Sequence, residues 1–277
     1  MTIQDGGRIG WRRFGVPMGG VMDDYSARVA NLLVDNAPDT PLLEMLLQGQ
    51  RLRVLQSTWI ALAGADGSST LANWHAARIT AGSELVFPCN RAGVWIYLAV
   101  AGGVTDGPGM FGSSSVSARA GLGSALQAGD MIRQRGESLM HVPEAVASRI
   151  APADEHRDFS RSPALRVWKG PQWDWFSAET RNRFFSESWT ISSKSDRVGY
   201  RLEGPELNVP DQQLISEPVR IGSIQIPESG HPIVTLRDGP TVGGYPKLGM
   251  IDPRDLSWLT QCRPGQAIRF RPFDHSQ

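Results

Sequence analysis

The chain has 277 residues, 40% of them apolar and 20% charged, which is long enough to bury a substantial core, and we expect two domains. Lys plus Arg and Asp plus Glu both total 28, so no net positive charge is available to attract nucleic acid or an anionic membrane. The longest apolar stretch, residues 92–104, is too short and too rich in glycine to span a bilayer, and the first residues lack a secretory signal. We therefore expect a cytoplasmic protein with no nucleic-acid or membrane partner.

Cysteine and histidine give no sign of a metal site. The two cysteines, Cys89 and Cys262, are too few for a disulfide framework, and we expect both to be small core residues. The five histidines are isolated in the sequence and lack the spacing of zinc ligands. We predict no metal.

The chain is predicted to be mostly β. Short runs rich in Val, Ile, Leu and aromatic residues recur along it, among them "WIALAGA", "VWIYLAV", "PIVTL" and "AIRFRP". They are separated by Gly, Pro, Asp and Ser, and 30 glycines and 19 prolines suit tight turns better than long helices.

A few short helices are expected, in chain order over residues 23–34, 177–188 and 252–262. The first begins with capping aspartates and places four apolar side chains on one face: Tyr25, Val29, Leu32 and Leu33. The last has Asp252 as N-cap and Pro253 at the first helical position.

The domain boundary is predicted from a change in composition. Residues 142–163 mix Pro, Ala and charged residues without strand alternation, and new strands begin at Leu165. We therefore predict one domain over residues 1–150, a linker over 151–163 and a second domain over 164–277.

Two arginine pairs share the pattern Arg-aliphatic-Gly-aromatic-Arg: Arg8 and Arg12 near the start, and Arg197 and Arg201 far along the chain. The repeat favours a duplicated β-domain. In a strand, residues i and i+4 lie on one face about 13 Å apart, with the intervening glycine leaving room for a ligand. Such a pair can hold a carboxylate or phosphate, or each arginine can form a structural ion pair with a nearby Asp or Glu.

The segment from Leu236 to Gly249, "LRDGPTVGGYPKLG", is the most irregular loop in the sequence. Its glycines, including Gly243 and Gly244, permit close approach of a ligand to backbone N–H groups. Thr241 offers a hydroxyl, Tyr245 an aromatic surface or a proton donor, and Lys247 a positive charge. The alternative interpretation is a plain structural turn.

Ser195 and Asp196 directly precede the second arginine pair, where they can serve as acceptors or form the turn that enters a strand. The Ser-rich loop over residues 111–124 has hydroxyls but no base beside them, and the Gly-x-Ser-x-Gly pattern of serine hydrolases is missing. No Walker-type Gly-Lys-Ser/Thr element occurs either.

Long ordered motifs along nearly the whole chain resemble one family. They include "TIQDGGRIGWRRFGVPMGGVMDDYSARVANLLV", "SDRVGYRLEGPEL" and "SEPVRIGSIQIPESGHPIVTLRDGPTVGGYPKLG". The chain is similar in these motifs to the allophanate hydrolase subunit 2 family, also called the biotin-dependent carboxyltransferase family, to which the C-type subunit of bacterial ATP-dependent 5-oxoprolinase belongs.

The resemblance implies two tandem cyclophilin-like β-barrel domains and a companion protein of the allophanate hydrolase subunit 1 type, which in 5-oxoprolinase is the B-type subunit. A third, lactam-opening subunit is a further implied partner, and the implied substrate is a small amide or lactam. ATP is then used at the level of the complex. The alternatives within the family are transfer of a carboxyl group from carboxybiotin on a separate carrier to urea, and a non-catalytic protein that binds its companion subunit.

The chain departs from the family pattern mainly in its first half. Family members usually have about ten more residues before the "IQD" segment, and the usual Gly-Ser-Arg-Ser-Thr loop reads Gly-Ser-Ser-Ser-Val over residues 112–116. The resemblance therefore favours the second arginine pair as the anion site. We expect Lys247, Tyr245 and Asp196 to act in catalysis. The residues expected to bind substrate or anion are Arg197, Arg201, Ser195, Gly243, Gly244, Thr241, Arg8 and Arg12.

Overall fold

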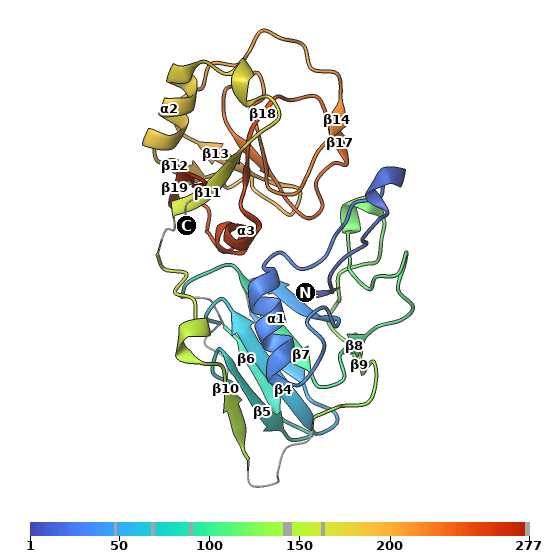
Figure 1. The fold of residues 1–277 in the computed structure, drawn as a ribbon. Helices are drawn as coiled ribbons and strands as arrows, with labels where there is room; N and C mark the ends of the chain where they lie inside the picture. The colour runs from blue at the N-terminus through green and yellow to red at the C-terminus, as the bar shows by residue number, and fades with distance from the viewer. Residues whose placement is uncertain (47–48, 68–69, 89–90, 141–145, 162–163, 275–277) are drawn as a thin grey trace. The chain divides into compact units, whose positions relative to one another are not determined.

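The computed structural model describes the whole chain apart from residues 47–48, 68–69, 89–90, 141–145, 162–163 and 275–277. Its contacts divide the chain into two compact units. Unit 1 consists of Met1–Ile9 and Gly19–Ser160, and unit 2 consists of Gly10–Met18 and Arg161–Gln277. Strands dominate both units, so the mostly β prediction is confirmed (Figure 1).

The strands of unit 1 are β1 (Thr2–Gln4), β2 (Leu42–Leu46), β3 (Gln50–Arg53), β4 (Thr58–Gly64), β5 (His75–Ile79), β6 (Glu84–Phe87), β7 (Trp95–Val100), β8 (Val104–Thr105), β9 (Arg133–Gln134) and β10 (Ser148–Ile150). Its helical segments are α1 (Asp24–Leu33) and the short 3-10 turns η2 (Ala118–Ala120) and η3 (Ala153–Glu155). Six strands form one antiparallel sheet in the order β1-β2-β7-β4-β5-β10, and among the described residues β3 pairs with β6 and β8 with β9.

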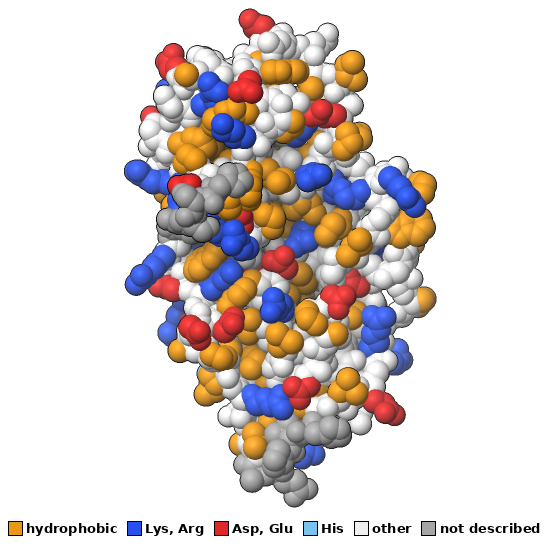
Figure 2. All heavy atoms as spheres, in the orientation of Figure 1, with side chains coloured by type: hydrophobic (Ala, Val, Ile, Leu, Met, Phe, Trp, Pro, Cys, Tyr) orange, Lys and Arg blue, Asp and Glu red, His pale blue; other side chains and the backbone are white. Residues whose placement is uncertain are grey.

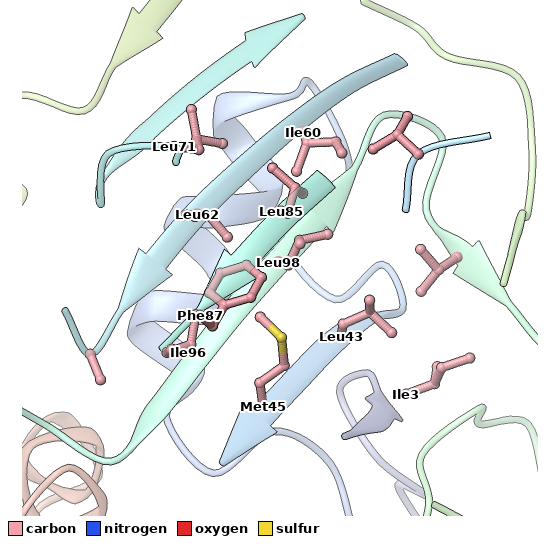
Figure 3. Packing of buried hydrophobic residues seen from close by; sticks show 13 residues of the cluster. Ile3, Leu43, Met45, Ile60, Leu62, Leu71, Leu85, Phe87, Ile96 and Leu98 are labelled. Atoms are coloured by element: carbon pink, nitrogen blue, oxygen red, sulfur yellow. The ribbon is translucent and has the colours of Figure 1, made fainter. Parts of the chain in front are cut away.

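The core of unit 1 lies on one face of this sheet. Figure 3 shows Leu85 and Phe87 of β6 beside Ile96 and Leu98 of β7, and each of these buried side chains contributes roughly 1.5–3 kcal/mol. Strand alternation sends Ala61, Ala63 and Ala99, together with the larger Tyr97, to the other face of the sheet. Helix α1 packs against β4 and β7 there.

Helix α1 matches the predicted range closely. The Asp23 side chain accepts a hydrogen bond from the backbone N–H of Ser26, as its N-cap position predicts. Its buried face differs from the predicted one: Ala27 and Ala30 are buried, whereas Leu32 is about half exposed. The small alanines allow α1 to lie close to the alanine-rich face of the sheet.

The strands of unit 2 are β11 (Ala164–Lys169), β12 (Trp189–Ile191), β13 (Gly199–Glu203), β14 (Glu217–Pro218), β15 (Ser223–Gln225), β16 (Ile233–Thr235), β17 (Val242–Gly243), β18 (Lys247–Ile251) and β19 (Ala267–Pro272). Its helical segments are η1 (Arg12–Phe14), η4 (Trp173–Trp175), α2 (Ala178–Ser186) and α3 (Pro253–Thr260). Seven strands close a barrel in the order β11-β18-β15-β16-β13-β12-β19, and β14 and β17 form a separate ladder.

Both helices of unit 2 lie where the sequence predicts them. Ser177 caps α2 by accepting from Thr180 N–H, and Asp252 caps α3 by accepting from Arg254 N–H. Phe184 of α2 stacks on Phe270 of β19, with 4.6 Å between the ring centroids, which fixes the helix against the barrel. None of the described helices has the length and apolar character needed to cross a membrane.

Candidate functional site

The arginine pair Arg197 and Arg201 does not lie on one face of a strand. Arg197 sits in the bend before β13, and its Nε donates to Oδ2 of Asp238 across 2.8 Å. The Asp238 carboxylate is almost fully buried, so this ion pair ties the start of β13 to the loop that follows β16. Arg197 thus forms the structural ion pair that the sequence left open as the alternative to an anion clamp.

Arg201 lies within β13 and points away from the barrel interior. The burial of Gly199, Tyr200 and Leu202, with Arg201 and Glu203 exposed, follows strand alternation from Tyr200 onward. The Tyr200 hydroxyl reaches inward and donates to the carbonyl of Thr260 across 2.8 Å. Arg201 and Arg197 therefore have different surroundings.

Ser195 and Asp196 form the turn that leads into β13. The Asp196 carboxylate accepts from the N–H groups of Val198 and Gly199 at 2.8 and 3.2 Å, as in an Asx turn. Ser195 Oγ accepts from the backbone N–H of Arg201 at 3.1 Å. Both contacts are structural, and they hold the strand entry in place.

Lys247 is the predicted site residue with the most distinctive environment. It begins β18, its side chain is only 4% exposed, and its Nζ lies 2.5 Å from Oε1 of Glu217. The Glu217 side chain is 33% exposed, so the pair joins a buried ammonium to a carboxylate that reaches water. The hydrogen bond from Lys247 lowers the pKa of Glu217, against the opposing effect of burial.

Gln172 links both partners of this ion pair. Its Nε2 donates to Glu217 Oε1 at 2.9 Å, and its Oε1 accepts from the backbone N–H of Lys247 at 3.0 Å. Gly170, two residues earlier, approaches so closely that an added Cβ would lie 2.2 Å from the Lys247 carbonyl oxygen. The segment before α2 therefore packs closely against the start of β18.

The strand register brings a second glutamine to the same place. Gln225 of β15 pairs with Lys247 of β18, and Glu217 of β14 pairs with Gly243 of β17. Gln225 Nε2 donates to Thr235 Oγ1 at 2.7 Å, while its Oε1 would lie 3.2 Å from a Cβ added at Gly243. The absence of a side chain at Gly243 thus lets the Gln225 side chain pack closely against the backbone of β17.

Arg12 belongs to unit 2 and reaches the end of the β14–β17 ladder. Its guanidinium donates to the carbonyl oxygen of Val219 and, at 3.2 Å, to that of Pro240. A backbone hydrogen bond extends the β14–β17 ladder by one step, because the Val219 N–H donates to the carbonyl of Thr241 at 3.0 Å. Burial lowers the pKa of the Arg12 guanidinium.

The remaining loop residues lie at the surface of this ladder. Tyr245 is 48% exposed, and Val242 of β17 and Ile215, just before β14, are more exposed still. Gly244 lies against the loop before β14, because an added Cβ would be 3.4 Å from Ser216 Oγ. The side chain of Tyr245 is therefore accessible to solvent, two residues before Lys247.

We call the side chains of Gln172, Glu217, Gln225 and Lys247, with Gly243 between them, the barrel cluster. Lys247 and Gly243 were predicted as site residues, and Glu217, Gln172 and Gln225 were not. The one available signal was a buried polar residue in an apolar strand, since Gln225 stands between isoleucines in "SIQIP". The partners of Lys247 come from β14 and from the segment before α2, and only the fold brings these together.

Arg8, the fourth predicted arginine, is buried in unit 1 and donates to the carbonyl oxygen of Ser115. Three residues earlier, the Asp5 carboxylate accepts from Ser113 Oγ at 2.6 Å, Ser115 Oγ at 2.5 Å and the Ser114 N–H at 2.6 Å. The Ser-rich loop over residues 111–124 therefore closes around Asp5 as an internal anchor.

The two copies of the arginine pattern have different structures. Gly10 has a φ of 88°, and its neighbours form a turn and the 3-10 segment η1. Gly199 instead begins the regular strand β13. The repeat in sequence is not a repeat in structure, because only the second copy continues into a strand.

Cys262 follows α3 and is buried, as predicted. Its Sγ donates to the Trp258 carbonyl across 3.4 Å, and burial raises the pKa of its thiol to about 12. Cys89 lies outside the described residues. Among the residues that the structure describes, no three His, Cys, Asp or Glu side chains gather as a metal site.

Comparison with known proteins shows similarity along nearly the full length of the chain. It is 33% identical over 287 residues to the C-type subunit of 5-oxoprolinase from Haemophilus influenzae, covering 97% of this chain and 87% of that protein. The solved structure of TTHA0988 matches with a TM-score of 0.86 and 35% identity over 97% of this chain, which spans about half (53%) of that chain. The urea amidolyase of Kluyveromyces lactis matches with a TM-score of 0.88 and 28% identity over 99% of this chain, but only 18% of that chain.

The family comparison covers nearly all of the chain described above. Residues 14–272 match one family. This range contains all residues of the barrel cluster and most of unit 1. The chain belongs to the carboxyltransferase domain, subdomain A and B, family.

Proposed function

We propose that the chain is the C-type subunit of a multi-subunit enzyme that cleaves an amide or lactam, with 5-oxoproline as substrate and ATP used by the complex. The observation that carries this proposal is the match to the C-type subunit of 5-oxoprolinase over 97% of this chain and 87% of that protein. A similarity that covers most of both proteins favours a shared role more than one that covers a small part of a larger enzyme.

We place the substrate-binding function at the barrel cluster. A lactam presents one carbonyl acceptor and one N–H donor side by side. The Lys247 ammonium is a donor and the Glu217 carboxylate an acceptor, and the two groups are held 2.5 Å apart, so the pair is complementary to a lactam. In this proposal Lys247 also stabilises negative charge that develops on the carbonyl oxygen when the amide bond opens.

Other residues of the cluster orient this pair. Gln172 holds both Glu217 and the backbone of Lys247, which fixes the direction of the carboxylate. Gly243 allows the Gln225 side chain to pack closely against the backbone of β17, and the exposed Tyr245 ring offers a surface on the same loop. We propose Tyr245 as a contact to substrate or to a companion protein that corresponds to the B-type subunit of 5-oxoprolinase.

Two of the expected anion-binding or catalytic residues of unit 2 already have carboxylate partners. Lys247 is paired with Glu217 and Arg197 with Asp238, so a polyphosphate would have to displace a carboxylate at either position. The same holds for the carboxylate of carboxybiotin. We therefore assign ATP to the complex, and we propose no reaction step on this chain that uses ATP or carboxybiotin.

The experiment that tests the proposal measures glutamate released from 5-oxoproline by the chain co-expressed with its companion subunits, with and without ATP. We expect turnover to fall by about 100-fold in Lys247→Met and in Glu217→Gln, the loss typical of a missing transition-state donor or its partner. Glu203→Gln is the matched control, because Glu203 is exposed on the same barrel. Full turnover by both cluster variants would refute the site, and a stable complex that never releases glutamate would refute the function.

A second candidate is transfer of a carboxyl group to urea or a related amide. The TM-score of 0.88 to the Kluyveromyces lactis urea amidolyase favours it, together with the name of the matched family. This reaction needs carboxybiotin on a separate carrier, so avidin would abolish it. ATP-dependent glutamate release that is insensitive to avidin would decide for the lactam reaction.

A further inference from the structure

Arg12 is a half-buried cation with neutral acceptors. Its Nη2 donates to the carbonyl oxygens of Val219 and Pro240, and no carboxylate among the described residues pairs with it. The other terminal nitrogen, Nη1, is shielded from solvent and has no hydrogen-bond acceptor among these residues. A shielded cation is normally paired, because an unmatched buried donor or charge is costly. The guanidinium of Arg12 is therefore suited to an anion that the described part of the chain does not supply.

The end of the ladder where Arg12 lies adjoins the barrel cluster. Val219, whose carbonyl Arg12 holds, follows Glu217 by two residues, which is roughly 6.6 Å along a strand. A Cβ added at Gly243 would lie 3.0 Å from Val219 Cγ2 and 3.2 Å from Gln225 Oε1. Val219 thus packs against the same glycine as the cluster does, and the guanidinium of Arg12 lies within about two residues of Glu217 along the ladder.

Two further arginines lie at this end of the ladder. Arg220 follows Val219 and Arg13 follows Arg12, and both side chains are exposed. Neither forms an ion pair within the part of the chain that the structure describes. The Arg13 guanidinium lies over the Phe14 ring, 4.8 Å from its centroid, and Figure 2 shows Lys and Arg side chains among hydrophobic ones on one face of the molecule.

The neighbouring acidic residues are already engaged. Glu217 is paired with Lys247, and Asp238 with Arg197. Residues 11–14, 219–220 and 240–241, which meet at the end of the ladder, contain three arginines and no Asp or Glu. This place is therefore short of negative charge, which a bound carboxylate would supply through charge-assisted hydrogen bonds.

We propose that Arg12 recognises a carboxylate on the amide substrate, so that the site takes amides that carry a carboxylate and not neutral amides such as urea. This inference rests on the proposed function, because the amide group must lie between Lys247 and Glu217. In 5-oxoproline the carboxylate is attached to the carbon next to the lactam nitrogen, so an N–H that faces Glu217 keeps the carboxylate close to that residue. The half-buried position of Arg12 strengthens such a contact, because the local dielectric is low.

The test compares two lactams that differ only in the carboxylate, 5-oxoproline and 2-pyrrolidinone. Isothermal titration calorimetry measures the Kd of each for the full chain, alone and co-expressed with its companion subunits. We expect the wild type to bind 5-oxoproline about 10- to 100-fold more tightly, the scale of a hydrogen bond to a charged group. Inorganic phosphate is added as a competitor, because a phosphate site and a carboxylate site use the same donors.

Arg12→Gln should reduce the preference for 5-oxoproline to about 1 and change the Kd of 2-pyrrolidinone by less than about twofold, since this lactam has no group for Arg12 to bind. A general loosening of residues 10–18 would weaken both lactams alike, so the ratio of the two Kd values isolates the carboxylate contact. Arg13→Gln is the matched control, because Arg13 carries the same charge but lies over the Phe14 ring. If Arg12→Gln does not fold, the wild-type ratio and Arg12→Lys, with an expected intermediate ratio, still test the assignment.

A wild-type preference that disappears in Arg12→Gln and persists in Arg13→Gln supports the assignment. Three results overturn it and leave the proposed function intact: equal affinity of the wild type for both lactams, a preference that survives Arg12→Gln, and displacement of 5-oxoproline by an equal concentration of phosphate. Failure of the proposed function gives a different result, since then neither lactam binds or Lys247→Met changes neither Kd, and the assignment of Arg12 falls with it.

Discussion

Arg197 Nε and Asp238 Oδ2 lie 2.8 Å apart, and this ion pair joins two segments that are 41 residues apart in the sequence. The carboxylate of Asp238 is the more buried partner. The relationship makes Arg197 a structural residue of the barrel and separates its role from that of Arg201 on the exposed face of β13.

Arg197→Ala should therefore lower the free energy of unfolding by about 3 kcal/mol, because it leaves a buried carboxylate without its partner. Arg201→Ala should change it by less than about 0.5 kcal/mol, as is usual for an exposed side chain. Urea denaturation of the two variants measures the difference. An equal loss of unfolding free energy in Arg197→Ala and Arg201→Ala would contradict a structural role for Arg197 alone.

The Lys247–Glu217 pair should make the stability of the fold decrease at acidic pH. The folded pKa of Glu217 lies below its ordinary value, chiefly through the hydrogen bond from Lys247. The pair therefore stabilises the fold at neutral pH, and this contribution is lost as pH falls below about 4.5 through the folded pKa of Glu217. Carbon-13 NMR of the carboxyl group, assigned with Glu217→Gln, should show that Lys247→Met raises the pKa of Glu217. An unchanged pKa would refute the coupling.

Arg12 should hold the segment 10–18 against unit 2 through its two carbonyl contacts. Arg12→Ala removes charge-assisted hydrogen bonds worth about 1.5–3 kcal/mol each, so cleavage by chymotrypsin at the exposed Phe14 should become faster. Arg13→Ala is the control, because the Arg13 guanidinium lies over the Phe14 ring and takes no part in the two carbonyl contacts. The same cleavage rate in both variants would argue against this anchor.

Asp5 should be a major stabilising residue of unit 1. Asp5→Asn disturbs a carboxylate that accepts from two serine hydroxyls and two backbone N–H groups, and we expect a loss of about 3 kcal/mol in thermal or urea unfolding. Ser115→Ala should cost about 1–2 kcal/mol. Ser114→Ala should be near neutral, since Ser114 contributes its backbone N–H; a cost equal to that of Ser115→Ala would contradict the contact pattern.

The Cys262 thiol should be unreactive in the folded protein. Its pKa of about 12 and its burial leave almost no accessible thiolate at pH 8. In a Cys89→Ser variant, which has a single thiol, Ellman's reagent should react only after denaturation. Fast reaction of the native variant would show that the region after α3 opens readily.

The sequence predicted local structure well where the signal was local. The helix caps Asp23, Ser177 and Asp252 each act within three residues, so their helices were found at nearly the observed bounds. The face of α1 was less well predicted, because the buried alanines carry little hydrophobic signal while Leu32 carries much. Close packing on an alanine-rich sheet, not side-chain hydrophobicity, selected the face.

The candidate site depended on contacts that no local pattern contains. Lys247 was singled out by its unusual loop, but its partner Glu217 lies 30 positions earlier and meets it only through the pairing of β14 with β17. The two arginines of the pattern do not share a strand, for the related reason that Arg197 lies before β13 and not within it. Strand boundaries and register, set by the whole barrel, decided both cases.

The assignment of Gly10–Met18 to unit 2 has a consequence for biosynthesis. The ribosome makes Arg12 early, whereas its acceptors Val219 and Pro240 follow 207 and 228 residues later. Unit 2 therefore cannot be completed until almost the entire polypeptide has left the ribosome, and this closure is slow compared with that of a local hairpin. A gene fragment that starts at residue 161 would omit a structural piece of the very unit it was meant to encode.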